Sequence, residues 1–194
     1  MFIVIEGLDG SGKSTIAKKL AELLNAKLIS TPGEDFKQIR ASLDMIFSKN
    51  IEARQLFYAA TVLMASEGAK SCLALGKFVI ADRYWLSTQV YHNWMSDGRH
   101  LQLSDVERKL LIPNITVYLD ISHNDRLTRV FERDNNTQDD YQTLTSEAHN
   151  LLSNHYINLS TSRIVGHWLR VDASKDIATV VDVIMEKIRE LGNI

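Results

Sequence analysis

Short apolar runs alternate with longer amphipathic stretches along the 194 residues of the chain. The runs are rich in Val and Ile and favour buried strands, whereas the longer stretches place apolar residues three and four positions apart, which favours helices. Because strands and helices alternate, the pattern predicts an α/β fold with a five-stranded parallel sheet and helices on both faces. The predicted strands cover approximately residues 2–5, 26–30, 77–82, 115–120 and 165–171.

Polar and breaker residues bound the predicted helices. Gly76 marks the end of one helix, Ser122 caps the start of another, and Ser104 with Glu107 matches a capping box. The segment 134–140 is polar and aperiodic, and we expect it to be a mobile loop. The longer helices are predicted approximately over residues 13–24, 35–48, 51–75, 84–95, 141–161 and 174–191. With no repeat, low-complexity segment or linker, residues 1–194 are predicted to form a single domain.

The composition narrows the class of protein. Apolar residues make up 45% of the chain and charged residues 24%, as in globular proteins. The net charge of -2, without a basic block, gives no sign of a nucleic-acid polymer as partner. The chain has one cysteine, no signal-peptide pattern and no apolar run long enough to cross a bilayer. We therefore expect a cytoplasmic protein that does not bind a membrane.

The segment Gly7–Ser14 carries the strongest chemical signal. It reads Gly-Leu-Asp-Gly-Ser-Gly-Lys-Ser between a predicted strand and a predicted helix, which is the context of a phosphate-binding P-loop. Its glycines let backbone N–H groups surround a phosphate, and the following helix directs its positive end towards the same anion. Lys13 can reach the outer phosphates, and the Ser14 hydroxyl can bind Mg²⁺. The segment therefore predicts binding of a nucleoside triphosphate.

A second group of polar residues follows the third predicted strand. Ligands of parallel sheets bind outside the carboxyl ends of the strands, where the P-loop and Asp82-Arg83 both lie. Asp82 can hold Mg²⁺ beside Ser14, and Arg83 can grip a second phosphate with a bidentate fork. Alone, the two residues could be a helix cap and a surface cation. Beside a P-loop, we interpret them as parts of a donor and an acceptor phosphate site.

Three arginines, Arg126, Arg129 and Arg133, lie at helical spacing just before the polar loop. A movable segment that carries an arginine can close over a transferring phosphoryl group, stabilise its charge and exclude water. Spaced arginines can also form an ordinary solvated helix face. We expect a short lid over approximately residues 133–142, with Arg133 as its catalytic arginine.

Four stretches in order along the chain resemble the thymidylate kinases, a family of P-loop nucleoside monophosphate kinases. Residues 2–15, FIVIEGLDGSGKST, look like the opening of the family. Residues 82–92, DRYWLSTQVYH, are similar to its Asp-Arg-Tyr-x-x-Ser-x-x-Ala-Tyr-Gln signature. Residues 113–120 resemble its fourth strand, and residues 171–174 the end of its last strand. The resemblance implies the nucleoside monophosphate kinase fold, a homodimer, and Mg²⁺-dependent transfer of the ATP γ-phosphate to a deoxynucleoside monophosphate, which we expect to be dTMP.

The resemblance also implies roles for individual residues. Those acting in catalysis would be Asp9, Lys13, Arg83 and Arg133. ATP would be bound by Gly7, Asp9, Gly10, Ser11, Gly12, Lys13, Ser14, Thr15, Arg129, Ser174 and Lys175. The acceptor would be bound by Asp9, Tyr58, Arg83, Ser87 and Tyr91, with Tyr58 stacked on the base and Tyr91 against the sugar. Mg²⁺ would be held by Ser14 and Asp82.

Two departures from the family pattern keep other functions open. Val62 stands where the family has an arginine that helps to read the base, which motivates a kinase of another or modified nucleotide, or of another phosphorylated small molecule. Asp139-Asp140 makes the predicted lid acidic, which motivates a nucleotide-binding regulatory protein with weak or no transfer activity.

Overall fold

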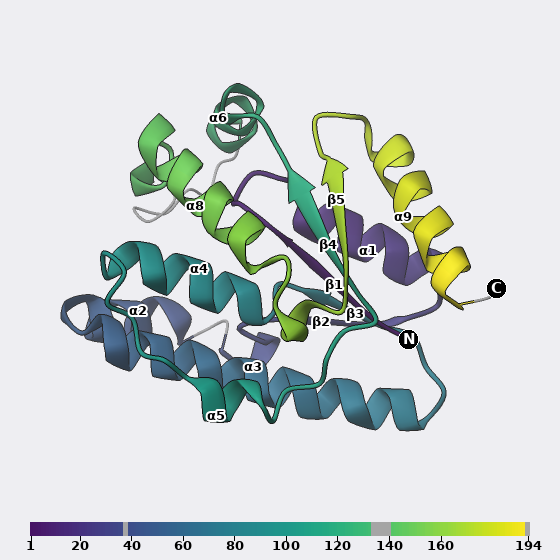
Figure 1. The fold of residues 1–194 in the computed structure, drawn as a ribbon, viewed down its shortest axis with the longest axis horizontal. Coiled ribbons are helices and arrows are strands. Elements are labelled where there is room, and N and C mark those ends of the chain that lie inside the picture. The colour runs from purple at the N-terminus through teal and green to yellow at the C-terminus, as the bar shows by residue number, and fades with distance from the viewer. Residues whose placement is uncertain (37–38, 133–140, 193–194) are drawn as a thin grey trace.

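The computed structural model describes residues 1–36, 39–132 and 141–192. Its five strands are all parallel and form one sheet in the order β2-β3-β1-β4-β5, which confirms the predicted fold class (Figure 1). The strands are β1 (Phe2–Gly7), β2 (Lys27–Ser30), β3 (Val79–Asp82), β4 (Ile115–Asp120) and β5 (His167–Asp172). The helices are α1 (Lys13–Leu23), α2 (Arg40–Ile46), α3 (Ile51–Ala74), α4 (Trp85–Met95), α5 (Ser104–Glu107), α6 (His123–Phe131), α8 (Ser146–Leu159) and α9 (Ile177–Gly192).

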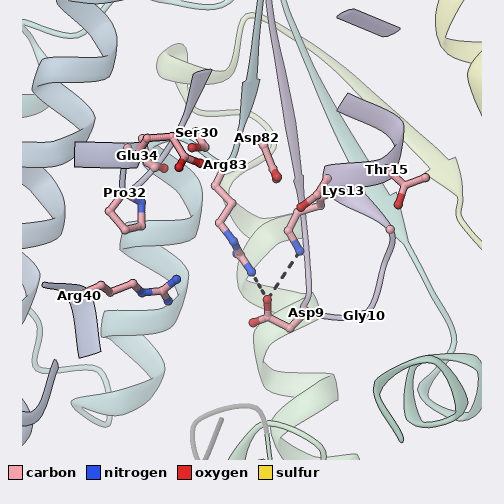
Figure 2. Close-up of a pocket in the computed structure, with 14 residues that line it drawn as sticks. Asp9, Gly10, Lys13, Thr15, Ser30, Pro32, Glu34, Arg40, Asp82 and Arg83 are labelled. Carbon is pink, nitrogen blue, oxygen red and sulfur yellow. Dashed lines mark hydrogen bonds and ion pairs between the residues drawn. The ribbon is translucent and has the colours of Figure 1, made fainter. Parts of the chain in front are cut away.

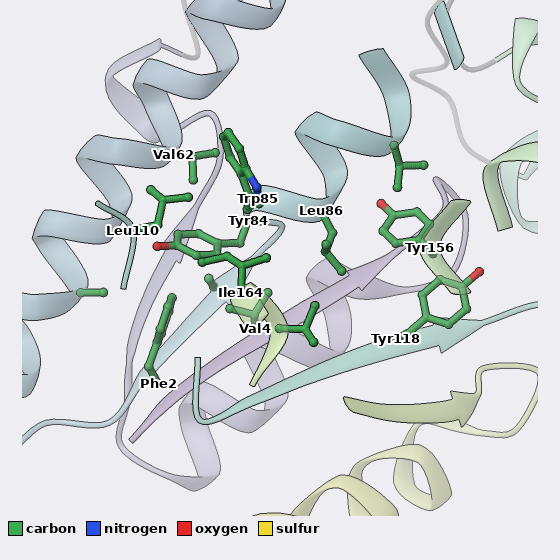
Figure 3. Close-up of a cluster of buried hydrophobic side chains, with 14 of the residues drawn as sticks. Phe2, Val4, Val62, Tyr84, Trp85, Leu86, Leu110, Tyr118, Tyr156 and Ile164 are labelled. Carbon is green, nitrogen blue, oxygen red and sulfur yellow. The ribbon is translucent and has the colours of Figure 1, made fainter. Parts of the chain in front are cut away.

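The central strand β1 is buried along its whole length and contributes side chains to both halves of the core. Phe2 and Val4 join a cluster with α3, α4 and α8 on one face of the sheet (Figure 3). Ile3 and Ile5 join a second cluster with α1 and α9 on the other face. This alternation follows the two-residue period of a strand. Because β1 is fixed from both faces, the loop that follows it starts from a rigid base.

The predicted helix over residues 35–48 is wrong as a single element. The structure has a short 3₁₀ turn, Glu34–Phe36, then α2 and a further 3₁₀ turn, Phe47–Lys49. None of the residues of α2 is buried, and the exposed fractions of Met45 and Ile46 are 74% and 69%. The helical spacing is present, but the segment packs mainly at its two ends, where Phe36 and Phe47 contact Phe57 of α3, and no continuous apolar face is buried.

The helix-capping predictions have mixed outcomes. Ser122 accepts a hydrogen bond from the Asp125 N–H at 3.1 Å and caps α6, as expected. The predicted capping box is wrong, because α5 is a single turn without a side-chain cap and Glu107 accepts a hydrogen bond from the Trp85 indole at 2.7 Å instead. The single helix predicted over residues 141–161 is interrupted at residues 143–145, and α8 begins at Ser146, where Thr145 caps it.

Candidate functional site

The P-loop Gly7–Ser14 joins β1 to α1 at the carboxyl edge of the sheet. Gly7 and Gly10 have φ values of +147° and +92°, in backbone that L side chains rarely adopt. A Cβ atom at Gly7 would lie 2.8 Å from the Leu119 carbonyl oxygen, and one at Gly10 would lie 2.9 Å from Cγ2 of Val130. The shape of the loop is therefore fixed from beneath by β4 and α6, and glycine is needed at both positions.

Lys13 is almost completely buried at the start of α1. Its Nζ atom donates a hydrogen bond to the Leu8 carbonyl oxygen at 2.7 Å and lies 3.9 Å from the Asp9 carboxylate. Burial lowers the pKa of Lys13 to about 7, and the neighbouring Arg83 guanidinium contributes to the same shift. A phosphate in the loop would favour the charged form of Lys13, because its negative charge replaces the lost hydration. The loop thus presents a cation that an anionic ligand stabilises.

Asp9 is the side chain at which the two predicted phosphate sites meet (Figure 2). Its carboxylate pairs with the Arg83 guanidinium, accepts a hydrogen bond from the Tyr91 hydroxyl at 2.8 Å, and faces Lys13. Burial alone would raise the pKa of Asp9, but Arg83 and Lys13 outweigh this effect and hold the pKa well below its usual value. Asp9 therefore stays charged and links the cation of the P-loop with the cation that follows β3.

Arg83 is held by its backbone and by three neighbours. Its φ of +70° is unusual for a residue other than glycine, and such strain gathers at functional sites. Its Nη1 donates to the Ser87 hydroxyl at 3.0 Å, its Nη2 contacts Asp9, and its guanidinium carbon lies 5.4 Å from the centre of the Tyr91 ring. Although burial works against the charge, the Asp9 carboxylate raises the pKa of Arg83 well above its ordinary value. The guanidinium is thus a preorganised, permanently charged fork.

A cavity of about 440 Å³ lies between the P-loop, the ends of β2 and β3, and the start of α2 (Figure 2). Lys13 and Arg83 line it, and so does Arg40, which carries no functional prediction from the sequence analysis. The Arg40 Nε atom donates to the Tyr58 hydroxyl at 3.2 Å and lies 3.5 Å from Asp44. A lone arginine at a helix start resembles any surface cation, so only the fold reveals it. The lining residues are Asp9, Gly10, Gly12, Lys13, Ser14, Thr15, Ser30, Thr31, Pro32, Gly33, Glu34, Arg40, Asp82 and Arg83.

Ser14 and Asp82 line this cavity together and fit the chemistry of a Mg²⁺ site. The Asp82 Oδ1 atom is buried and has no hydrogen-bond partner among the described residues. An unpartnered buried carboxylate oxygen is costly and suits a hard cation, which prefers oxygen ligands. The Ser11 hydroxyl of the P-loop is also buried without a partner in the described chain, so two orphaned oxygen atoms border the predicted phosphate site.

Two of the predicted acceptor-binding residues have partners within the protein. The Ser87 side chain is buried, and its hydroxyl contacts Arg83 and Glu6. The Tyr58 hydroxyl contacts Arg40 and Asp44, and Tyr58 is not among the residues that line the cavity. Their roles towards the acceptor remain predictions. Val62 is completely buried in the core, so it cannot contact a base in this arrangement.

Three of the predicted ATP-binding residues, Arg129, Ser174 and Lys175, gather near the end of β5. Arg129 donates from Nη2 to the Ala173 carbonyl oxygen at 2.7 Å, and its Nη1 lies 3.9 Å from the position of a Cβ atom at Gly12. Ser174 hydrogen-bonds to Asp172, and Lys175 lies 3.8 Å from the same carboxylate. The structure thus brings Arg129, the P-loop and the turn after β5 together.

Arg126 is another of the three arginines that precede the predicted lid, and it has a role that its sequence position did not reveal. It is completely buried and donates to the Asp9 carbonyl oxygen at 2.7 Å and to the Thr143 carbonyl oxygen at 2.6 Å. Arg126 therefore supports the P-loop from below and does not face the cavity. Arg133 and most of the predicted lid, residues 133–140, lie outside the described residues.

The comparison with protein families matches the thymidylate kinase model to residues 5–184. The chain belongs to the thymidylate kinase family. It is 33% identical to the thymidylate kinase of Buchnera aphidicola subsp. Baizongia pistaciae over 81% of each chain. It is 30% identical to the thymidylate kinase of Chlamydia abortus over 99% of this chain and 97% of the relative. The family resemblance of the sequence is therefore confirmed.

Solved structures of deoxyadenosine kinase from M. mycoides share the fold of this thymidylate kinase family member. The one with dCMP and dCDP bound superposes with a TM-score of 0.70 at 22% identity and covers 98% of this chain and all of the other. At that identity the likeness concerns the fold alone. Within the described residues, no helix combines the length and apolar content needed to cross a membrane, and no three His, Cys, Asp or Glu side chains form a metal cluster.

Proposed function

We propose that this protein transfers the γ-phosphoryl group of ATP to dTMP and releases ADP and dTDP. The observation that carries the proposal is the Asp9 carboxylate, which contacts both Lys13 of the P-loop and Arg83 after β3 within one cavity. A protein that only binds ATP needs the first cation, whereas a kinase of a monophosphate needs a second one beside it. Membership of the thymidylate kinase family supports dTMP as the acceptor.

The residues of the chain act mainly by position and charge. A phosphate oxygen of dTMP attacks the γ-phosphorus of ATP in line with the bond to the β-phosphate, which breaks as ADP leaves. Lys13 binds the ATP phosphates, and Arg83 with Arg40 holds the acceptor phosphate. Holding both groups in one cavity converts a bimolecular reaction into one within a complex, and fixed cations stabilise the charge of the transition state.

A Mg²⁺ ion would be held at Ser14 and, through water, at Asp82. When bound, the ion neutralises charge on the β- and γ-phosphates of ATP. The Asp82 Oδ1 atom is buried without a partner among the described residues, so it gains one when the site is filled. We expect that Asp82→Asn reduces the stabilisation of the protein by Mg-ATP in thermal unfolding while ATP without Mg²⁺ stabilises both forms alike.

The direct test is ADP release from Mg-ATP with each common ribo- and deoxyribonucleoside monophosphate. We expect fast turnover with dTMP and no comparable turnover with the ribonucleotides. The Lys13→Met protein, prepared in parallel, controls for a contaminating kinase. Binding of ATP without turnover on any acceptor would contradict the proposal and favour a regulatory nucleotide-binding protein.

A second candidate keeps the mechanism and changes the acceptor base. Val62 occupies the position at which the family has a base-reading arginine, and its side chain lies in the core. Recognition of thymine would therefore have to come from other side chains. Turnover with dUMP or another monophosphate in preference to dTMP would support this candidate.

We further propose a cytoplasmic homodimer. The helices α2 and α3 are neighbours in the fold (Figure 1), and each exposes large apolar side chains that a second copy of the chain could cover. These exposed side chains include Met45, Ile46, Leu56 and Met64. Light scattering on the purified protein should give the mass of a dimer, and Ile46→Glu combined with Met64→Glu should give the mass of a monomer.

A further inference from the structure

Glu6 is an acidic side chain in the core of the fold. It precedes the last residue of β1 and is completely buried. The strand alternation places it on the same face of the sheet as Phe2 and Val4, the face covered by α4 and α8. Burial raises the pKa of its carboxyl group. A carboxylate in such a place is costly unless hydrogen bonds compensate for the lost water, so the contacts of Glu6 identify its role.

The first pair of contacts ties Glu6 to the start of α4. Its Oε1 atom accepts hydrogen bonds from the N–H groups of Tyr84 at 3.0 Å and Ser87 at 3.2 Å. These N–H groups lie at the end of the helix where backbone donors lack partners within the helix, and Tyr84, the N-cap residue, provides no side-chain cap. From strand β1, the Glu6 side chain therefore caps helix α4 and places negative charge at the positive end of the helix.

The second pair of contacts reaches Arg83 through one hydroxyl group. The Ser87 Oγ atom lies 2.5 Å from Oε2 of Glu6 and 3.0 Å from Nη1 of Arg83. Arg83 can only donate, so the Ser87 proton points to Glu6 and its lone pair points to the guanidinium. The Tyr156 hydroxyl, from α8, lies 3.0 Å from Ser87 Oγ and 3.4 Å from Glu6 Oε2, and it closes the network. The Tyr156 ring belongs to the core cluster of Figure 3.

The backbone at Arg83 needs this support. Its left-handed φ of +70° carries a steric cost that the surrounding structure must offset. The next residue, Tyr84, is bound through its N–H group to Glu6, so the carboxylate fixes the turn directly after Arg83. Glu6 consequently acts on both ends of Arg83, on its backbone through Tyr84 and on its guanidinium through Ser87.

We propose that Glu6 is a positioning residue for the acceptor phosphate, which holds Arg83 in the orientation that faces the cavity. The inference rests on the proposed function, because it takes Arg83 as the clamp for the acceptor. It assigns the Ser87 hydroxyl to the support of Arg83. Lys13 and Arg83 are then positioned by different means, Lys13 by the P-loop and Arg83 by a buried carboxylate.

The test is the variant Glu6→Gln. The amide keeps one acceptor oxygen but puts an N–H₂ group in place of the other, so it no longer accepts the Ser87 proton. We expect the KM for dTMP to rise about 10- to 100-fold and the KM for ATP to stay unchanged, because only the acceptor clamp loses its orientation. In nuclear magnetic resonance spectra, the guanidinium N–H signals of Arg83, assigned by their loss in Arg83→Lys, should broaden through faster exchange.

The matched control is Gln55→Met. Gln55 is also completely buried, and its amide makes two hydrogen bonds with the backbone of Leu101, at 2.8 and 2.9 Å. Its loss should lower the free energy of unfolding but change neither KM nor the Arg83 signals. Ser87→Ala serves as the second test variant and decides the matter if Glu6→Gln does not fold, since it should show the same selective rise in the KM for dTMP.

The proposal is overturned if the folded Glu6→Gln or Ser87→Ala protein keeps the wild-type KM for dTMP and unchanged Arg83 signals. It is also overturned if both KM values rise equally, as a general loss of stability would cause. Failure of the proposed function looks different, because the wild-type protein would then not turn over dTMP. The Arg83 signals would still respond to Glu6→Gln in that case, since they report the orientation without any substrate.

Discussion

The donor and acceptor sides of the cavity are built in different ways. On the donor side, Lys13 and the backbone of Gly7–Ser14 come from one continuous segment between β1 and α1. On the acceptor side, Arg83 follows β3 and is held by Ser87 and Tyr91 of the adjoining helix α4 and by Asp9, which is distant in the sequence. Local sequence thus determines the donor side, whereas the acceptor side depends on tertiary contacts. Changes on the donor side should abolish turnover, and changes on the acceptor side should weaken acceptor binding by degrees.

The largest expected effect is that of Lys13→Met. The variant removes the only P-loop cation from the cavity and should lower kcat by about 1,000-fold or more, because charge on the transferring group loses a fixed partner. Steady-state kinetics measures the loss, and Lys19→Met, an exposed lysine on the same helix, is the control. If the kcat of Lys13→Met stays within about tenfold of the wild-type value, Lys13 does not stabilise the transition state and the proposed role is wrong.

Arg83→Lys should have the next largest effect and should be confined to the acceptor. Lysine keeps the charge but loses the planar fork, so we expect the KM for dTMP to rise about 10- to 100-fold with little change in the KM for ATP. Kinetics with each substrate varied in turn separates the two constants. Arg108→Lys, which changes an exposed arginine paired with Asp105, should change neither. An equal rise in the KM values for dTMP and ATP would contradict separate donor and acceptor sides of the cavity.

Gly10→Ala, on the donor side, has a matched control in Gly76→Ala, in the turn between α3 and β3. Both glycines have positive φ, but a Cβ atom at Gly76 has no neighbour within 4 Å, whereas one at Gly10 meets Val130 and Arg126. We expect Gly76→Ala to lower the free energy of unfolding by about 1 kcal/mol through backbone strain alone. Gly10→Ala should cost more and should also weaken ATP binding. Urea unfolding and calorimetry give the two quantities, and equal behaviour of the pair would contradict the tight fit beneath the loop.

The smallest expected effect is a change in the protonation state of Lys13. Lys13 has a pKa of about 7 in the folded protein against 10.5 without the fold. Between these values the unfolded state binds more protons, so the stability of the ligand-free protein should rise with pH over this range. Phosphate binding favours the charged lysine, so Mg-ATP binding at pH 8 should take up a fraction of a proton. Calorimetry in two buffers of different ionisation enthalpy measures this uptake, and equal uptake by Lys13→Met would contradict it.

The same contrast explains what could be predicted from the sequence. The P-loop, the parallel sheet and the strand-end position of Asp82 and Arg83 follow from local patterns and from the rule that ligands bind at the carboxyl ends of strands. Arg40 could not be predicted, because its place opposite Arg83 depends on how α2 sits against α3 through Asp44, Tyr58 and Arg54.

Two buried charged residues show more clearly what sequence patterns alone do not reveal. Arg126 has the spacing of a solvated helix face, yet it lies under the P-loop and binds the Asp9 backbone. Glu6 gave a signal that could have been used, since it is an acid that directly follows the apolar run Phe2–Ile5, on the face that strand alternation assigns to the core. A charge at a core position of a strand that leads into a P-loop indicates a support for the site.

The most direct test of the account is the affinity of a bisubstrate compound in which adenosine and thymidine are joined through five phosphates. If both phosphate sites share one cavity around Asp9, calorimetry should show binding at least about 100-fold tighter than that of ATP or dTMP alone, because the second contact becomes intramolecular. Both ATP and dTMP should displace it. An affinity no higher than that of ATP, with displacement by ATP only, would contradict a shared donor and acceptor cavity.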